Sequence, residues 1–232
     1  MLKSTGSGLT NALFIGAIGI AAAGASAVLV TDRGVAADHL DPPGRTDIRV
    51  DPTIDLPADI ADIYTWTDSS NLNMVYTFAG PSAGTLPAFY DPNVRYRIHV
   101  SNGGRTDDDE YLIVAQFGPG QGGNGIKFDG LPGVTGSFIG PVERILTAPN
   151  GVKVYAGLRS DPFFFDVLGF RETNSTGNLA ILNTRNFFIN GNDTMIGVQI
   201  PIAIVGRDSN GDGRVDNRMD IWVDAFRKGG QL

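Results

Sequence analysis

The sequence predicts an all-β or β-rich α+β protein, built as one antiparallel β-sandwich-like domain with short helical turns. Three observations support this fold class. Short runs of β-branched and aromatic residues recur along the chain, glycine (31 residues) and proline (13 residues) separate these runs, and no long amphipathic helix interrupts them. Short strands with turn residues between them are typical of β-sandwiches.

The first segment, residues 1–37, is predicted to be a signal peptide. Lys3 provides a positive charge, residues 12–30 are apolar, and residues 35–37 (Val-Ala-Ala) match a small-residue cleavage site. Residues 25–27 form a second cleavage candidate, and an uncleaved membrane anchor is the alternative because the apolar run approaches spanning length. The Ala and Gly content of the run favours cleavage. We therefore expect a periplasmic, cell-surface or secreted protein with no membrane insertion after cleavage.

The remaining chain, residues 38–232, is long enough for one domain with a sizeable core. The whole sequence carries 18 Lys and Arg against 25 Asp and Glu, a net charge of −7. This acidic balance argues against a nucleic-acid partner and suits cation binding. The chain has no cysteine, which excludes thiol nucleophiles and Cys-ligated zinc. Stability must therefore come from the core, with a metal as a further contributor.

The clearest strand is 94–100, where Tyr96, Ile98 and Val100 alternate with polar residues that include His99. Alternation with a period of two places the apolar residues on the core face and His99 on the exposed face. The other predicted strands are 73–78, 111–117, 136–139, 151–155, 187–189, 195–205 and 220–224.

Between the strands, residues 59–64 and 162–166 are predicted to form single helical turns, and the glycine-rich stretch 118–125 is predicted to be a connecting loop. The three phenylalanines at 163–165 are expected to pack in the core, because aromatic rings dominate core burial. Next to them, Arg159 and Asp161 are expected to form an ion pair.

A calcium-binding loop is the most specific motif. Oxygen-bearing side chains recur at alternate positions from Asp208, and Gly213 permits the sharp turn that such loops need. Calcium requires six to eight oxygen ligands at short range, and a tight acidic loop supplies several together. The predicted calcium ligands are the side chains of Asp208, Asn210, Asp212, Asp216 and Asp220, together with the backbone carbonyl of Arg214.

The loop differs from an EF-hand in two ways. Met219 occupies the position where an EF-hand has a bidentate Glu, and Asp220, one residue further, is an imperfect substitute. The flanking segments 202–205 and 221–223 have the composition of strands, which is closer to dockerin-like extracellular calcium modules. The alternative is a solvated turn, because Asp, Asn and Gly dominate turns in general.

Several segments together resemble the DUF4331 family of exported bacterial proteins. They are Asp38-His-Leu-Asp-Pro-Pro43, Asp59-Ile-Ala-Asp-Ile-Tyr64, the strand 94–100 with the acidic residues after it, and Tyr155-Ala-Gly-Leu-Arg-Ser-Asp-Pro-Phe-Phe-Phe-Asp166. The resemblance extends from residue 38 to about residue 205. Leu40 and Asp41 depart from the family's opening segment, and the chain is short for the family. Since the family has no established biochemical role, the resemblance implies export and a β-rich fold.

A second candidate site combines His39 and Asp41 with Asp59 and Asp62. Imidazole and carboxylate groups suit a metal site or an acid–base pair. The alternative is an N-terminal segment whose polar side chains cap a turn. The acidic run 107–110 is a further cation candidate, with a solvated hairpin turn as its alternative.

These observations predict an exported calcium-binding protein with a structural or binding role in the cell envelope or at the cell surface. Calcium is the expected cofactor, and self-association or a cell-surface partner is the expected kind of interaction. The alternative is a metal-dependent hydrolase that uses His39 with Asp59 and Asp62. The absence of a Gly-x-Ser-x-Gly motif and the presence of only two histidines argue against serine-type catalysis.

Overall fold

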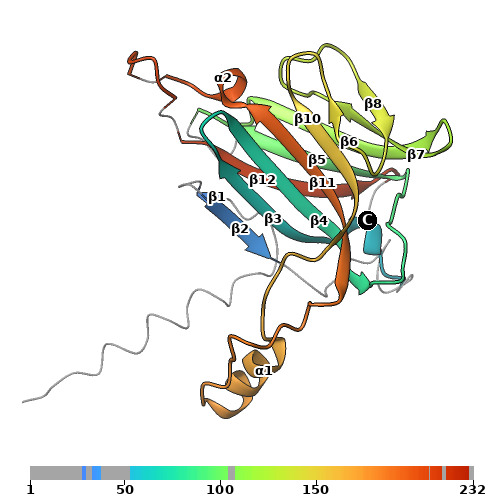
Figure 1. Ribbon diagram of the computed structural model, residues 1–232, viewed down its shortest axis with the longest axis vertical. Coiled ribbons are helices and arrows are strands. Elements are labelled where there is room, and N and C mark those ends of the chain that lie inside the picture. Colours follow the sequence, from blue (N-terminus) through green and yellow to red (C-terminus); the bar gives the residue numbers. More distant parts are fainter. Residues whose placement is uncertain are drawn as a thin grey trace, which may run out of the picture.

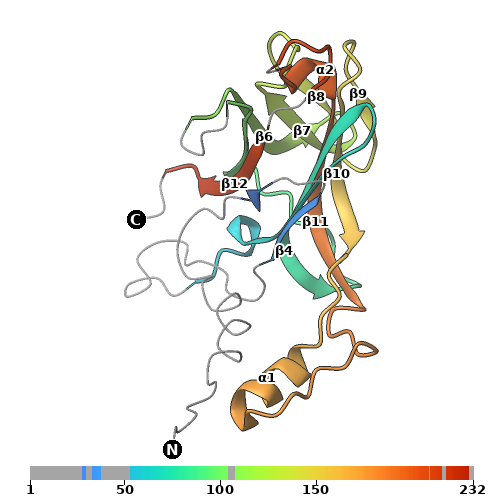
Figure 2. The same cartoon turned by 90° about the vertical axis from the view of Figure 1, so that its left-hand side faces the viewer.

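The structure is a computed structural model that describes residues 28–29, 33–37, 53–103, 108–208, 210–215 and 218–229. For residues 28–29 and 33–37 it describes the backbone alone. Within these ranges the chain forms two antiparallel sheets that pack face to face, as Figures 1 and 2 show. The predicted antiparallel β-sandwich-like domain is therefore confirmed.

Sheet A has the strand order β1-β12-β5-β6-β7-β8. Its strands are β1 (Val28–Leu29), β5 (Val94–Ser101), β6 (Tyr111–Gly120), β7 (Gly123–Asp129), β8 (Phe138–Pro141) and β12 (Asp220–Arg227). The predicted connecting loop at 118–125 is wrong, because these residues form the paired ends of β6 and β7, from Gly118↔Gly125 to Gly120↔Gly123. Because glycine has no side chain, this segment shows no alternation of apolar and polar residues that would predict a strand.

Sheet B has the strand order β2-β3-β4-β11-β10-β9. Its strands are β2 (Arg33–Ala37), β3 (Ile60–Thr67), β4 (Asn71–Ala83), β9 (Leu146–Thr147), β10 (Lys153–Ser160) and β11 (Gly191–Pro201). The predicted helical turn at 59–64 is wrong, since Ile60 opens β3. A short 3-10 helix, η1 (Leu56–Ala58), precedes it, with Pro57 near its start.

The core lies between the two sheets and is rich in aromatic side chains. The rings of Phe78 in β4 and Tyr96 in β5 have centroids 4.2 Å apart, and Phe117 in β6 lies 5.9 Å from Tyr96. Ile98 and Val100 are buried beside them, at 1% and 0% exposure. The inward face predicted for strand 94–100 is therefore confirmed.

Two helices interrupt the strands. The side chain of Asp166 caps the start of helix α1 (Val167–Thr176) by accepting a hydrogen bond from Gly169 N. The helix ends at Gly177, which has a φ of 74°. The helical turn predicted at 162–166 is therefore wrong, because the helix begins only at Val167. Helix α2 (Ile202–Val205) occupies a segment predicted as strand, and the strand predicted at 187–189 is a turn.

Strands β1 and β2 lie inside the predicted signal peptide. Strand β2 pairs with β3 from Arg33↔Trp66 to Ala37↔Asp62. Cleavage after Ala37 would remove both strands, whereas cleavage after Ala27 would leave both in place. Among the residues that the structure describes, no helix has the length and apolar character needed to cross a membrane.

Candidate metal centre

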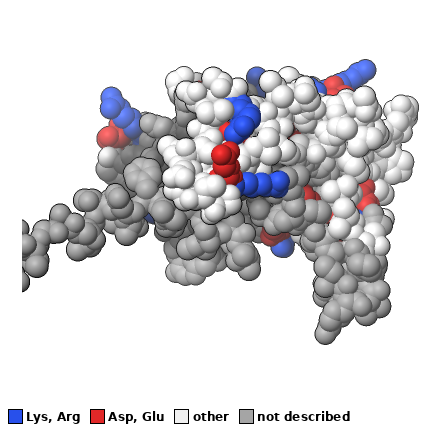
Figure 3. Space-filling model, turned by 90° about the horizontal axis from the view of Figure 1, so that it is seen from below, with Lys and Arg blue, Asp and Glu red and all other residues white. Residues whose placement is uncertain are grey.

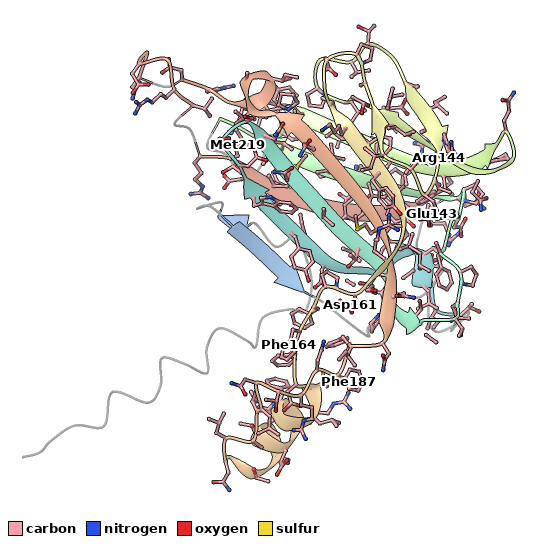
Figure 4. The ribbon with its side chains drawn as sticks, in the orientation of Figure 1. Glu143, Arg144, Asp161, Phe164, Phe187 and Met219 are labelled. Carbon is pink, nitrogen blue, oxygen red and sulfur yellow. The ribbon has the colours of Figure 1, made fainter. Side chains whose placement is uncertain are left out.

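Three aspartates converge at one end of sheet B. Asp62 comes from β3, Asp193 from β11, and Asp161 directly follows β10. One carboxylate oxygen of each residue lies within 4.8 Å of the corresponding oxygens of the other two. Figure 4 labels Asp161 at the junction between the sandwich and the segment that carries α1. We call this group the aspartate centre.

Irregularities in three neighbouring strands bring the carboxylates together. The register between β3 and β4 shifts between Ile60 and Asp62, and the register between β4 and β11 shifts at Asp193. In β4, which separates these two strands, Gly80 provides the space: a β-carbon at this position would lie 1.7 Å from Asp193 Oδ1. Bulges of this kind redirect a side chain out of the regular ladder, and they are frequent beside functional sites.

Asp193 is the most informative member of the centre. Its side chain is 0% exposed, and neither carboxylate oxygen has a hydrogen-bond partner among the residues that the structure describes. Asp62 is equally buried and accepts a hydrogen bond of 2.8 Å from the Tyr64 hydroxyl. Asp161 is half-buried and accepts one of 2.8 Å from Phe163 N. A buried carboxylate without a donor is costly, so Asp193 requires either a proton or a cation.

Burial has a clear electrostatic consequence. It raises the pKa of Asp62 from 3.8 to about 7 and that of Asp193 from 3.8 to about 7, and the nearby charge of Asp161 raises both further. The Thr77 hydroxyl lowers the pKa of Asp193 but does not reach hydrogen-bond geometry with it. Burial also raises the pKa of Asp161. A cation bound here would lower these pKa values, because an opposite charge favours the ionised form of a carboxylate.

The donor set indicates the type of cation. The group consists of carboxylates alone, which are hard oxygen ligands preferred by Ca²⁺, Mg²⁺ and Mn²⁺. Zinc and copper sites in proteins usually include nitrogen or sulfur ligands. The centre therefore suits a hard divalent cation.

The predicted calcium loop lies elsewhere and is exposed. Asp208 Oδ1 accepts a hydrogen bond of 2.6 Å from Gly211 N, and its Oδ2 accepts one of 2.7 Å from Gly213 N. Asp212 Oδ1 accepts one of 2.9 Å from Arg214 N, and Asn210 Oδ1 accepts one of 2.9 Å from Asp212 N. Gly213 has a φ of 85°, as the predicted sharp turn requires. These bonds hold the loop in a closed turn.

Two predicted ligands of this loop are not joined to it by the described contacts. Asp216 lies outside the described residues. Asp220 is buried at the start of β12, where its Oδ1 accepts a hydrogen bond of 2.7 Å from Arg218 Nε. Within the described part of the chain, Asp220 forms no three-membered carboxylate group with Asp208 and Asp212.

The second predicted site is only partly described. His39 and Asp41 lie outside the described residues. Asp59 is buried but does not belong to the aspartate centre, whereas Asp62 does. Asp62 is thus the one predicted site residue among the three converging carboxylates, and no ligand role was predicted for Asp161 or Asp193.

The predicted ion pair between Arg159 and Asp161 is wrong. Arg159 Nη1 instead lies 3.3 Å from Glu143 Oε2, and its guanidinium lies over the Tyr155 ring, 4.2 Å from the centroid. Residues two apart share a face only within a strand, and β10 ends at Ser160, between Arg159 and Asp161. Figure 4 labels both Glu143 and Asp161.

The exposed position predicted for His99 is also wrong. His99 is 9% exposed and stacks on Trp222 of β12, with ring centroids 4.8 Å apart. Its Nδ1 lies 2.9 Å from Asp109 Oδ2, and its Nε2 lies 3.1 Å from Asp224 Oδ2. In the acidic run predicted as a further cation site, Asp109 therefore contacts His99. Neighbouring Glu110 accepts a hydrogen bond of 2.7 Å from Asn102 N.

Comparison with known proteins gives no relative. No family model matches the chain, and neither a curated protein nor a solved structure matches it. The resemblance to DUF4331 proteins stays a prediction that is based on the motifs in the sequence.

Proposed function

We propose that this chain is an exported, calcium-binding β-sandwich protein of the cell envelope or surface with a structural or binding role. In this proposal the aspartate centre is the principal cation site. The observation that carries the proposal is Asp193, a fully buried carboxylate whose two oxygens have no hydrogen-bond partner while two further carboxylates face it. A divalent cation would offset the burial of these charges.

Calcium is favoured over smaller hard cations. The structure gives three carboxylates that come from three separate strands or strand ends, and calcium tolerates such irregular oxygen shells. Magnesium demands near-ideal octahedral geometry and retains several waters. Calcium is also abundant in the extracellular compartments that the predicted leader indicates.

The Asp208 loop is proposed as a second, weaker site. Both oxygens of Asp208 already accept backbone hydrogen bonds, and the loop is exposed to water. A cation there would add less stabilisation, because the carboxylates are solvated without it. Met219 replaces the bidentate Glu of an EF-hand, which also reduces the expected affinity.

A hydrolytic role receives less support. The pKa values near 7 of Asp62 and Asp193 would suit a general acid or base. However, both side chains are 0% exposed, so a substrate has no route to them in this conformation. Asp161 is half-buried, so that an ion could reach the centre from the side of this residue.

Isothermal titration calorimetry with CaCl₂ on the purified chain tests the proposal. We expect a tighter binding event that Asp193→Asn removes and a weaker event that Asp212→Ala removes. The two variants are matched controls, since each alters one site. The proposal fails if the wild-type chain shows no binding, or if Asp193→Asn binds calcium in the same way as the wild type.

A further inference from the structure

A long segment projects from the sandwich between β10 and β11. We call residues 161–190 the arm. Figures 1 and 2 show α1 extending away from both sheets at one end of the longest axis. The chain enters and leaves the arm at one place, where the β10–β11 ladder ends at Ser160↔Asn192 and Asp161 N donates a hydrogen bond of 3.0 Å to Gly191 O.

Asp166 organises the interior of the arm. It accepts hydrogen bonds from Gly169 N (3.0 Å) and Leu182 N (2.9 Å), and it forms two hydrogen bonds with Arg185, of 2.6 and 2.8 Å. The hydrogen bond from Arg185 is the main cause that lowers the pKa of Asp166, against the opposing effect of burial. Hydrogen bonds to one carboxylate therefore connect the start of α1 with residues 182 and 185 of the returning chain.

Apolar side chains of the arm form a small cluster and also reach solvent. Phe163 contacts Phe188 with centroids 5.3 Å apart, and Phe165 contacts Phe170 at 5.6 Å. The prediction that 163–165 pack in the core is therefore wrong, because none of the three belongs to the core between the sheets. Phe164 is 57% exposed, and Figure 4 shows it on the arm. The exposed large apolar residues of the arm are Phe164, Leu168, Leu179, Ile181, Leu182, Phe187 and Ile189.

Figure 3 shows the charged side chains on the face of the molecule that is seen from the end with the arm. On the described part of the surface in Figure 3, a group of Lys or Arg and Asp or Glu side chains lies together near the centre, and large areas of other residues surround it. The arm thus presents exposed apolar side chains together with the exposed charges of Arg171 and Glu172.

The aspartate centre lies at the base of this arm. Asp161 is the first arm residue, and Asp193 lies in β11 just after the chain returns, whereas Asp62 belongs to β3 in the body of sheet B. A cation shared by all three would join the entry of the arm to two strands of the sandwich. Without one, ionised carboxylates within 4.8 Å of one another would repel, and this repulsion acts on the junction.

We propose that cation binding at the aspartate centre fixes the arm to the sandwich, so that the ion controls the order of the arm and of its apolar surface. This inference rests on the proposed function, because it requires a cation at the centre. Asp161 is the coupling residue, since the arm begins with it. The two strand residues, Asp62 and Asp193, hold the ion on the side of the sandwich.

Hydrogen exchange of the full chain, at a pH above 7 with millimolar calcium or with chelator, tests this inference. The readout is the set of arm amides that donate hydrogen bonds, including Leu182 and Phe187. We expect calcium to slow their exchange by about tenfold or more, because local opening of the arm would require release from the ion. Amides of β5 provide the reference for any global stabilisation.

Two variants test whether the slower exchange in the arm depends on calcium at the aspartate centre. Asp161→Asn, tested at a calcium concentration that saturates its remaining ligands, should lose the slowing in the arm. Asp212→Ala should respond to calcium like the wild type, because the Asp208 loop follows α2, which lies at the opposite end of the molecule from α1 in Figures 1 and 2.

The outcomes separate this inference from the proposed function. If calorimetry detects no calcium at the aspartate centre, both are wrong. If calcium binds there and exchange in the arm does not change relative to β5, the coupling is wrong and the cation site stands. The coupling is equally wrong if Asp161→Asn binds calcium and retains full protection of the arm.

Discussion

The aspartate centre and the Asp208 loop are two acidic regions with opposite construction. The centre gathers carboxylates from three distant parts of the chain, buries Asp62 and Asp193 completely, and leaves Asp193 without a hydrogen-bond donor. The loop takes its acidic groups from one short exposed segment, and backbone amides satisfy both oxygens of Asp208. We therefore propose that the centre, and not the loop with the ligand spacing, is the stronger cation site.

The difference shows what makes a carboxylate group depend on a cation. In the loop, water and backbone N–H groups stabilise the charges, so that the turn is complete without an ion. In the centre, burial removes water from the carboxylates, and the energetic cost remains until a proton or a cation neutralises them. Each of the following predictions tests this contrast.

The largest expected effect comes from closing the space beside Asp193. In Gly80→Ala, the added β-carbon would lie 1.7 Å from Asp193 Oδ1, so the carboxylate must move. We expect destabilisation by about 1–3 kcal/mol, as for other overpacked sites, and loss of calcium binding at the centre. Denaturant unfolding and calorimetry measure the two effects. The matched control is Gly118→Ala, where nothing lies within 4 Å of the added carbon.

Calcium should stabilise the folded protein through the centre. At about a hundredfold excess over Kd, the free energy of unfolding should rise by about 2.7 kcal/mol, or roughly 5–10 °C in Tm for a domain of this size. Asp193→Asn should abolish most of this rise, because it removes a charged ligand that the fold cannot otherwise satisfy. Thermal unfolding with calcium and with chelator measures it. An equal rise in the variant would place the stabilising ion elsewhere.

Stability and affinity at the centre should depend on pH in opposite directions. Because burial raises the pKa of Asp62 and Asp193 from 3.8 to about 7, the folded state retains protons that the unfolded state has lost. In chelator, the contribution of these two groups to stability should therefore be fully present below their unfolded pKa of 3.8 and be lost as the pH rises towards 7. Calcium affinity should rise over the same range, by about tenfold per pH unit for each proton displaced. Denaturant unfolding and calorimetry at several pH values check both trends, and a pH-independent affinity would contradict them.

The smallest expected effect belongs to the loop. Asp212→Ala removes the acceptor for Arg214 N at an exposed position, so stability with chelator should change by no more than about 0.5 kcal/mol. We expect a binding event with a Kd of about 10⁻⁴–10⁻³ M in the wild type to disappear. If this variant instead loses the tight event and most of the rise in Tm, the loop is the principal site and our ranking of the two regions is wrong.

Local patterns explain which features the sequence predicts. The alternation at 94–100 and the spacing from Asp208 to Asp212 are each contained in a few residues, and the inward face of Tyr96 and the turn at Gly213 follow from them. The predictions are wrong for two other segments. Residues 118–125 are predicted as a loop but form the paired ends of β6 and β7, and residues 202–205 are predicted as a strand but form α2.

The aspartate centre could not be predicted in this way, because it depends on strand order. Residues 62, 161 and 193 become neighbours only when β3, β4, β11 and β10 lie side by side. Bulges that sequence periodicity does not reveal then place Asp193 against Gly80. A usable signal was nevertheless present: Asp62 and Asp193 are acidic residues within strands that otherwise consist mainly of apolar and uncharged residues. Charges in such positions require a partner.

The central claim is that the aspartate centre holds a divalent cation, and a crystal structure of the chain grown with calcium or manganese tests it most directly. We predict an anomalous difference peak between Asp62, Asp161 and Asp193, with metal–oxygen distances of about 2.1–2.6 Å, and a weaker peak or none at the Asp208 loop. A strong peak at the loop together with no peak at the centre would contradict the claim.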